Sequence, residues 1–596
     1  MKVSVAEYVF KFLEEKGVKE AFIVAGGAAA HLLNSLYSSK INYICNNHEQ
    51  ACAMGAEAYS RVSKKPAVVL VTNGPGSSNT LTGVVGAFQD SIPMIVISGQ
   101  VSKKHTTNQE LNNVRQIGVQ ELDIIKIVKS ITKYSHQVDS ANEIKYHLEK
   151  AWHKANNGRK GPIWLDIPID IQSAKIEADK LLGYKFEYND NLKNESINYN
   201  FIIKKINDSK RPLIVAGNGI HLANVENDLL KLLSKTEIPV ISSWTAKDIF
   251  NWHSKQYIGN FGLFGERAAN FAVQKADLLI VLGCRLSIPN IGYETDLFSP
   301  NSYKIMVDID LSELNKKSIS IDLKINESLE IFIENLTNNI SNKRPLFNDW
   351  IKELNLLKNK YPVYLKEYSK ITNEGVNSYQ FIEVLSKKLE DDHIVVTDMG
   401  TSFTSTHQSL KTNGNNRLFT SSSCCSMGYG LPGGIGAYFA KKKSKIIVIA
   451  GDGGFQMNIQ ELQTVVQYNI PVKIFILNNN GYLAIKLMQD NLFSGNYIGS
   501  NPESGVSSPD FFKIAKAYGI KSTRIINNKY LSRNIQRVLN FEGPILCDIN
   551  MKPDQLLIPR VQSSKNEDGT LKSSSLDNMY PFLDEEELKE IMSIKN

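Results

Sequence analysis

The sequence predicts an α/β protein built from three doubly wound parallel-sheet domains. Short runs of β-branched and aliphatic residues alternate with helical segments along nearly the whole chain of 596 residues. Several of these runs end in glycine-rich turns, whose backbone angles let a strand lead sharply into a helix. The polar stretch at about 175–200 is predicted to be a linker, and the charged, helical stretch at 343–373 is predicted to bridge to the third domain. The predicted domains are 1–175, 199–338 and 376–560, followed by a tail at 561–596.

The first predicted domain opens with an amphipathic helix, MKVSVAEYVFKFLEEKG, whose acidic residues distinguish it from a signal peptide. Strands and helices then alternate: strands at 21–24, 41–45, 66–71 and 92–98, and helices at 51–60 and 80–87. The sequence has no run of about 18 apolar residues, so we expect no membrane-spanning helix.

The second and third predicted domains repeat this alternation. Strands are expected within 211–220, 238–244, 276–286 and 303–310 of the second domain, and at 394–396, 446–449 and 472–477 of the third. The tail is polar until Met579-Tyr580-Pro581-Phe582-Leu583. We expect it either to fold over an active-site mouth as a lid or to dock on the surface.

The segment from Lys445 to Lys486 has the most informative pattern. A strand ends at Gly451-Asp452-Gly453-Gly454, and a second strand ends at Asn478-Asn479-Asn480-Gly481. A right-handed βαβ crossover would bring Asp452 and Asn479 to one sheet edge. With a backbone carbonyl, that of Gly481, they form a sparse set of hard oxygen ligands, suited to a magnesium ion that also binds phosphate oxygens. The alternative is an ordinary βαβ turn.

The same segment predicts how its helix begins. Asn458 precedes Glu461 by three residues, as in a capping box, and the helix is expected to run to about Tyr468. Backbone N–H groups at a helix start near the metal would add donors for the same anion.

Composition excludes several classes of function. Apolar residues make up 42% of the chain and the net charge is only +7, with basic residues spread along the sequence, so nucleic-acid binding has little support. The six cysteines lack metal-site spacing, and the adjacent Cys424-Cys425 pair is poorly placed for a disulfide. A reducing, cytoplasmic location is therefore expected.

The pattern GDGGF…LNNNGY resembles the diphosphate-binding signature of thiamine diphosphate (ThDP) enzymes. The phrases HEQACA at 48–53 and TNGPGSSN at 72–79 resemble the acetolactate synthase branch of that family. This resemblance covers nearly the whole chain in the same order. It implies a pyrimidine-binding domain, a central Rossmann-like domain of the FAD type and a diphosphate-binding domain. It also implies ThDP, Mg²⁺ and FAD as cofactors, and a homodimer or homotetramer with active sites between subunits.

Glu49 is the residue that we single out in the first domain. A carboxylic acid in an apolar site, its pKa raised by desolvation, can supply the proton that the aminopyrimidine ring of ThDP needs. Taken alone, an acid in the first turn of a helix is more often a partner of the helix dipole. The resemblance makes Glu49 the cofactor activator, Gly27 a backbone neighbour of substrate, and Gln109 and Gln120 substrate contacts.

The resemblance assigns further site residues and agrees with the metal ligands expected from the βαβ pattern. The remaining cofactor-binding residues are Gly74, Asn79, Cys425, Met427, Gly451, Gly453, Gly454, Asn479, Gly481 and Tyr482. The metal ligands are Asp452, Asn479 and Gly481, and the FAD contacts are Gly217, Gly265, Asn270, Arg285 and Asp308. The chain departs from the family at Cys425, where relatives keep a glycine, and at 287–290, where an acidic pair is replaced. The second departure leaves open a domain with an empty groove.

The resemblance implies an enzyme that decarboxylates pyruvate and transfers the two-carbon acetyl unit to an acceptor carbonyl. Val119, Met488 and Ala25 replace the phenylalanine, tryptophan and proline of acetolactate synthases, which would open the pocket for a second 2-oxoacid or a keto-sugar, as in surface-polysaccharide pathways. Ile485 replaces the glutamate of simple decarboxylases, which favours C–C bond formation. The alternatives are a decarboxylase, a C–C lyase or hydrolase of the family, and a non-catalytic binding protein with the same fold.

Overall fold

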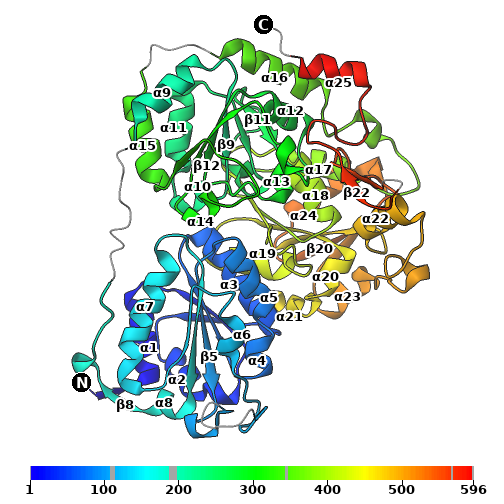
Figure 1. The fold of residues 1–596 in the computed structure, drawn as a ribbon. Coiled ribbons are helices and arrows are strands. Elements are labelled where there is room, and N and C mark those ends of the chain that lie inside the picture. The colour runs from blue at the N-terminus through cyan, green and yellow to red at the C-terminus, as the bar shows by residue number, and fades with distance from the viewer. Residues whose placement is uncertain (1, 108–113, 187–196, 342–346, 566–567, 594–596) are drawn as a thin grey trace.

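The computed structural model describes residues 2–107, 114–186, 197–341, 347–565 and 568–593. Three six-stranded parallel sheets, each flanked by helices, form three α/β layers (Figure 1). The predicted fold class is therefore confirmed.

The N-terminal sheet has the strand order β3-β2-β4-β5-β7-β6, and all its pairs are parallel. Its strands are β2 (Glu20–Ile23), β3 (Asn42–Cys45), β4 (Ala67–Val71), β5 (Met94–Gln100), β6 (Tyr134–Gln137) and β7 (Pro162–Pro168). Its longer helices are α1 (Val5–Glu15), α2 (Ala30–Tyr37), α3 (Glu49–Ser63), α5 (Leu81–Gln89) and α7 (Ile144–Asn156). The chain order reverses between β2 and β4, so their carboxyl ends form the crevice where doubly wound sheets bind ligands.

The central sheet has the order β11-β10-β9-β12-β13-β14, with its reversal between β9 and β12. Its strands are β9 (Pro212–Ala216), β10 (Val240–Ser242), β11 (Tyr257–Asn260), β12 (Leu278–Leu282), β13 (Tyr303–Val307) and β14 (Leu323–Ile325). The helices packed around it include α9 (Tyr199–Asp208), α11 (Glu226–Thr236), α12 (Arg267–Lys275), α15 (Leu329–Asn339) and α16 (Asn348–Lys360).

The C-terminal sheet has the order β16-β15-β17-β18-β20-β19. Its strands are β15 (Ile394–Thr397), β16 (Arg417–Phe419), β17 (Ile446–Gly451), β18 (Lys473–Asn478), β19 (Lys521–Ile525) and β20 (Ile545–Asn550). Its helices include α17 (Ser378–Ser386), α18 (Thr401–Ser409), α19 (Gly430–Ala440), α20 (Asp452–Gln456), α21 (Leu462–Gln467), α22 (Leu483–Phe493), α23 (Phe511–Ala517) and α24 (Leu531–Leu539).

The N- and C-terminal domains share one hydrophobic core. Strand residues of both sheets, such as Val69 and Val448, belong to a single buried cluster. At its centre α3 crosses α19 so closely that a Cβ atom on Gly436 would lie 2.0 Å from the carbonyl oxygen of Gly55. Because only glycine permits this backbone approach, the two helices fix the relative position of the two domains.

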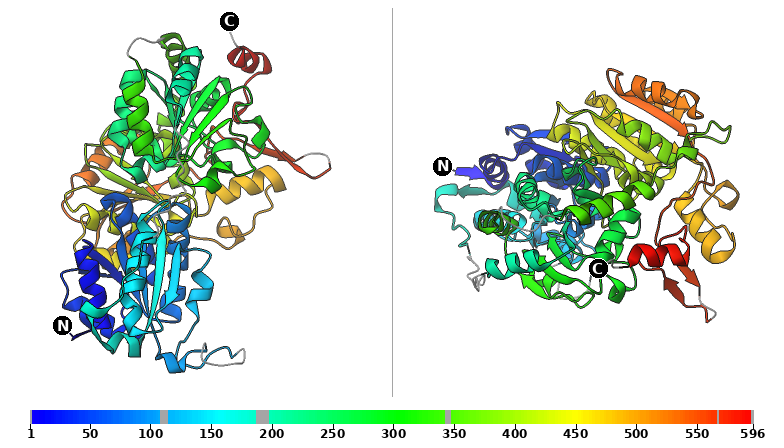
Figure 2. Two further views of the ribbon diagram at one scale, coloured as in Figure 1. Left: turned by 60° about the vertical axis from the view of Figure 1, so that its left-hand side comes forward. Right: turned by 90° about the horizontal axis from the view of Figure 1, so that it is seen from above.

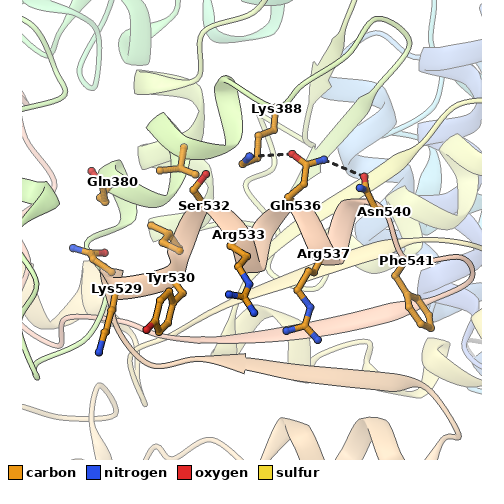
Figure 3. Close-up of a pocket in the computed structure, with 13 residues that line it drawn as sticks. Gln380, Lys388, Lys529, Tyr530, Ser532, Arg533, Gln536, Arg537, Asn540 and Phe541 are labelled. Carbon is orange, nitrogen blue, oxygen red and sulfur yellow. Dashed lines mark hydrogen bonds between the residues drawn. The ribbon is translucent and has the colours of Figure 1, made fainter.

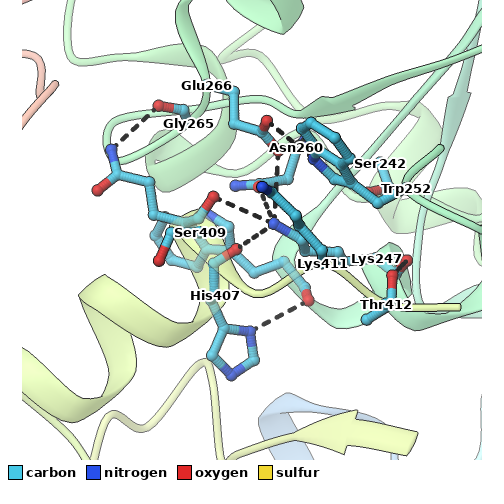
Figure 4. A network of polar contacts seen from close by, with 12 residues as sticks. Ser242, Lys247, Trp252, Asn260, Gly265, Glu266, His407, Ser409, Lys411 and Thr412 are labelled. Atoms are coloured by element: carbon cyan, nitrogen blue, oxygen red, sulfur yellow. Dashed lines mark hydrogen bonds and ion pairs between the residues drawn. The ribbon is translucent and has the colours of Figure 1, made fainter. Parts of the chain in front are cut away.

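A fully buried lysine attaches the central domain to the C-terminal domain (Figure 4). The Lys247 ammonium group lies 3.4 Å from Glu266 and donates to the backbone carbonyls of His407 (3.0 Å) and Gln408 (3.1 Å) at the end of α18. A cation at a helix C-terminus satisfies carbonyls that lack partners within the helix. Burial lowers the pKa of Lys247, and the contacts with Glu266 oppose that shift.

The tail returns to the central domain (Figures 1 and 2). Leu576 and Ile591, the latter on α25 (Glu585–Met592), join the central hydrophobic core. A two-stranded hairpin of β21 (Ser563–Lys565) and β22 (Leu571–Ser573) contacts α22, and Asn491 of that helix donates to the Ser563 carbonyl (3.0 Å). These contacts attach the tail to the central domain and to α22, and both the lid and the surface-docked alternative stay predictions.

Two expectations for local structure are wrong, one for the predicted linker at 175–200 and one for the predicted capping box at Asn458. The start of the predicted linker at 175–200 is ordered, because β8 (Lys175–Glu177) pairs antiparallel with β1 (Lys2–Ser4). Residues 187–196 lie outside the described residues.

The predicted capping box at Asn458 does not form, because tertiary contacts take both side chains. The Asn458 amide donates to Gln50 (2.9 Å) and to the Gly428 carbonyl (2.9 Å). Glu461 accepts hydrogen bonds from Asn46 and Asn47 of the N-terminal domain. The expected helix from Asn458 to about Tyr468 therefore begins as a 3-10 turn (Ile459–Glu461) and continues as α21, and α20 precedes it.

Among the described helices, none combines the length and apolar character needed to cross a membrane. All six cysteines are free thiols.

We predict that Gly436→Ala will lower the stability of the protein by about 1–3 kcal/mol or more, because overpacking at a rigid backbone contact cannot relax. Thermal and urea unfolding would measure the loss. Gly55→Ala is the matched control, since its Cβ meets the Phe22 ring at 3.1 Å and the Pro432 oxygen at 3.5 Å. Equal losses of stability in the two variants would contradict the claim that the backbone contact at Gly436 is the tighter constraint.

Candidate active site

Asp452 begins α20 directly after β17 and is 2% exposed. Its Oδ2 atom accepts hydrogen bonds from the Gly481 backbone N–H (3.0 Å) and the Ser508 hydroxyl (2.8 Å). The loop that follows β18 therefore lies against Asp452 at the carboxyl edge of the sheet. Burial raises the pKa of Asp452, and these hydrogen bonds oppose that shift.

Asp398 follows the neighbouring strand β15 and organises the segment that leads into α19. Its carboxylate accepts from the backbone N–H groups of Gly428 (3.1 Å) and Gly430 (2.9 Å), as well as from Met399 (2.8 Å). A Cβ atom on Gly454 would lie 2.3 Å from Asp398 Oδ1, so the glycine turn of β17 packs against the same side chain. One buried carboxylate thus holds two predicted cofactor-binding loops together.

Met427 lies at the junction of the central and C-terminal domains. It packs against an apolar cluster formed by Trp244, Met399 and Phe403. Cys425, two residues earlier, has a φ of 55°, in the left-handed region that favours glycine. This backbone conformation is one that glycine adopts more readily than cysteine.

Glu49 is the first residue of α3, after the N-cap residue His48. Its carboxylate accepts a hydrogen bond from the Asn79 amide (3.0 Å), which comes from the glycine-rich segment after β4. A Cβ atom on Gly76 would lie 3.8 Å from Glu49 Oε1. The structure thus brings two of the predicted N-terminal site residues, Glu49 and Asn79, into contact.

Gln120 and Gly74 also meet in the N-terminal domain. Gln120 has a φ of 57°, and its carbonyl would lie 2.4 Å from a Cβ atom on Gly74. Gly27 begins a 3-10 turn after β2, and no atom lies within 4 Å of the position of a Cβ there. Gln109 lies outside the described residues.

A cavity of about 680 Å³ lies where the three domains meet, between the β9 and β12 ends of the central sheet and the loop before Met427. Arg285 and Asp308 line it, as do Ser423 and Cys425 of the C-terminal domain. Gly217 lies against Gly283, which lines the cavity, since a Cβ atom on Gly217 would lie 2.2 Å from the Gly283 carbonyl oxygen.

Asn270 and Gly265 are not among the residues that line the cavity. The Asn270 amide donates instead to the carbonyls of Gly262 (3.1 Å) and Leu576 (3.0 Å), which ties the tail to the central domain. The Gly265 carbonyl accepts from Gln408 (3.2 Å). The role of Asn270 and Gly265 as FAD contacts stays a prediction. Their observed hydrogen bonds connect the central domain to the tail and to α18.

A larger, open groove of about 880 Å³ lies between α17 and α24, on the outer part of the C-terminal domain (Figure 3). Arg533, Arg537, Lys388 and Lys529 line it. It contains none of the residues that the sequence places in the site, so we assign the chemistry to the strand ends.

Family models match all three domains. The N-terminal thiamine pyrophosphate (TPP) binding domain of TPP enzymes matches residues 3–127, their central domain matches 199–336, and their C-terminal TPP binding domain matches 398–549. The similarity to curated proteins extends over most of the chain. A "Probable acetolactate synthase large subunit" of Methanococcus aeolicus is 31% identical over 575 residues, 93% of this chain and 92% of that protein. The chain belongs to the thiamine pyrophosphate enzyme family.

Other relatives place this TPP enzyme beside the acetolactate synthase large subunits. Those of Cyanidium caldarium and Lactococcus lactis are 32% and 29% identical over 568 and 566 residues. Each match covers more than nine-tenths of both chains. The suspected resemblance is thus confirmed, and the protein is a ThDP-dependent enzyme of the acetolactate synthase type.

Sequence reasoning missed several residues that shape the site of this TPP enzyme. No local pattern marked Asp398 and Ser508, because their partners lie 30 and 56 residues away in the sequence. Asn458 was marked only as a helix cap, and its contact with Gln50 of the N-terminal domain was missed. Asp398 carried the clearest available signal, because it follows a predicted strand and precedes Gly400 at the same sheet edge.

We predict that Asp398→Asn will weaken ThDP binding about tenfold or more. The amide nitrogen would face a backbone N–H, and one unsatisfied buried donor costs about 1–3 kcal/mol. Calorimetric titration with ThDP and Mg²⁺ would measure the affinity. Asp392→Asn, at an exposed residue just before the same strand, is the control. If an Asp398→Asn variant melted at the wild-type temperature and bound ThDP with wild-type affinity, this role of Asp398 would be contradicted.

Proposed function

We propose that this enzyme uses ThDP and Mg²⁺ to decarboxylate pyruvate and to transfer the resulting acetyl unit to an acceptor carbonyl. The observation that carries the proposal is the contact of the loop after β18 with Asp452, at the edge where β15 presents Asp398. Bound ThDP would supply the electron sink for decarboxylation. The protein contributes binding, orientation, proton transfer and exclusion of water.

The residues at this edge suit Mg²⁺. Asp452 offers one carboxylate, and the loop that touches it offers the Asn479 amide oxygen and the Gly481 carbonyl. Within the described residues, no group of three or more His, Cys, Asp and Glu side chains could hold a metal alone. A set with a single carboxylate is typical of Mg²⁺ that takes its other ligands from phosphate and water.

Glu49 is the group that we propose to hold and return a proton at the aminopyrimidine ring. Asn79 fixes its carboxylate, and the apolar helix that it begins, with Ala51, Cys52 and Ala53 fully buried, limits access of water from behind. Gly27, with open space beside its Cα atom, lets substrate approach the backbone.

The central cavity supports FAD as a further cofactor. It lies at the switch point between β9 and β12, where doubly wound sheets bind dinucleotides. Its volume of about 680 Å³ lies within the range of roughly 300–1,000 Å³ that is usual for ligand pockets. Arg285 would serve the diphosphate, and Asp308, whose pKa burial raises, would serve the sugar hydroxyls.

Three residues bear on the acceptor. Ile485 on α22 is 42% exposed and carries no titratable group, so it cannot deliver a proton to a carbanion equivalent. Met488 on the same helix is 39% exposed, and Val119 is 83% exposed. Their small or flexible side chains favour carboligation with a bulky acceptor, either a second 2-oxoacid or a keto-sugar.

A second copy of the chain is proposed to complete each active site. The Glu49 carboxylate is held by Asn79 of the same domain, at the edge of that domain. We infer a homodimer or a dimer of dimers, in which Glu49 of one copy faces the diphosphate site of another. Six free thiols support the cytoplasm as its compartment.

Incubation of the enzyme with pyruvate, ThDP and Mg²⁺ tests the function. We expect release of carbon dioxide and, by mass spectrometry, a product with a new C–C bond, with pyruvate alone or with an added keto-sugar. Free acetaldehyde as the sole product would indicate a decarboxylase. No carbon dioxide would refute the proposed use of pyruvate.

We predict that Glu49→Gln will abolish turnover but leave ThDP binding nearly unchanged, because the amide has the same shape and cannot relay a proton. Hydrogen–deuterium exchange at the thiazolium carbon, followed by NMR, measures the step concerned. Asn79→Ala, which removes only the hydrogen bond to the carboxylate, should give an intermediate rate. An exchange rate in Glu49→Gln equal to that of wild type would remove this residue from the mechanism.

We predict that Asp452→Ala will lose Mg²⁺-dependent ThDP binding rather than a later step, because the variant lacks the carboxylate that partners the metal. Titration with ThDP in the presence and absence of Mg²⁺ separates the two effects. Ser508→Ala, which removes one hydrogen bond to Asp452, is the control and should retain most of the affinity. Unchanged Mg²⁺-dependent affinity in Asp452→Ala would disprove the metal assignment.

A further inference from the structure

The segment from Ser421 to Gly430, here called the Met427 loop, is held at both ends by one buried network of the N-terminal domain. Arg61 of α3 bonds to Glu57 (2.7 Å) one turn away and to Asp90 at the end of α5. Arg61 and Glu57 are almost completely buried. Buried charges of this kind are stable only when they are paired and hydrogen-bonded.

The two carboxylates of this network reach the two ends of the Met427 loop. Asp90 accepts from the Ser422 backbone N–H (3.0 Å) and from the hydroxyl group of Ser423. Glu57 accepts from the hydroxyl group of Tyr429 (2.5 Å). Cys425 and Met427, the predicted cofactor contacts, lie between these anchor points.

The Ser423 hydroxyl also touches the central domain. Arg285, which lines the 680 Å³ cavity, donates to Ser423 Oγ (2.6 Å). A hydroxyl group can donate one hydrogen bond and accept others at the same time. Ser423 therefore joins Asp90 of the N-terminal domain and Arg285 of the central domain through one atom of the Met427 loop.

We propose that Ser423 is a positioning residue, which couples the ligand state of the central cavity to the Met427 loop and hence to the affinity for ThDP. The inference rests on the proposed function. A diphosphate that draws Arg285 into the cavity weakens its hydrogen bond to Ser423, and the Ser423 hydroxyl is then held by Asp90 alone. By linkage, ThDP and the cavity ligand change each other's affinity by the same factor.

A double-mutant cycle tests the bridge without any cavity ligand. Ser423→Ala and Arg285→Ala should each weaken ThDP binding, measured by calorimetry with Mg²⁺, by roughly tenfold. Ser423→Ala removes this contact together with the hydrogen bond to Asp90, so adding Arg285→Ala to it should cause no further loss, whereas independent effects would multiply to about a hundredfold. A multiplicative loss, or wild-type affinity in both single variants, would overturn the proposal.

Ser422→Ala is the matched control. It removes a hydroxyl contact of 3.3 Å to the same Asp90 carboxylate but keeps the backbone hydrogen bond, and Arg285 donates to Ser423 instead. When Ser422→Ala is combined with Arg285→Ala, the losses of ThDP affinity in the two single variants should multiply. Hydrogen–deuterium exchange of a peptide covering 421–430 should accelerate in Ser423→Ala and remain near wild type in Ser422→Ala. The same acceleration in both would contradict a special role of Ser423.

Addition of FAD provides the second arm. In wild type, saturating FAD should change the ThDP dissociation constant several-fold, and this change should disappear in Ser423→Ala. FAD that binds without any effect on ThDP affinity would overturn the coupling. Failure of FAD to bind would refute the flavin assignment alone, and the cycle above would still decide whether the bridge positions the loop.

Discussion

The backbone contact between Gly55 of α3 and Gly436 of α19 is the constraint on which the site depends. Glu49 begins the first of these helices and the Met427 loop leads into the second. A side chain at Gly436 would separate the helices and change how the two half-sites of one copy are oriented toward those of a second copy. The shared hydrophobic core fixes the angle, and the buried Glu57–Tyr429 hydrogen bond fixes the register of the crossing.

A buried lysine then connects the central domain to the C-terminal domain. Lys247 satisfies the carbonyls at the end of α18, whose first turn lies beside Asp398 and Met399. Trp244, three residues before Lys247, packs against Phe403 of the same helix with ring centroids 4.9 Å apart. The central domain is thus attached to α18, which contributes Phe403 to the apolar cluster around Met427. The cavity of the central domain opens beside the Met427 loop.

The sequence predicted the parts of the structure that local rules determine. Alternation and glycine turns gave the fold class, and the crossover rule placed the Gly481 loop beside Asp452. The capping box at Asn458 failed because Gln50, some 400 residues away, competes for that side chain. Asp398 and the Arg61 network could not be predicted from local patterns, since Asp398 binds Gly428, 30 residues away, and Arg61 binds Asp90, 29 residues away. The roles of Asn270 and Gly265, taken from resemblance, stay predictions beside their observed structural contacts.

The central claim is that two copies of this rigid unit supply complementary halves of each active site. The most direct test mixes two inactive variants, Glu49→Gln and Asp452→Ala, under conditions that exchange subunits. Half of the dimers should then be mixed, each with one intact site, so activity should recover toward about a quarter of the wild-type value. Demonstrated exchange without any recovery would place both halves of the site in one chain and contradict this account.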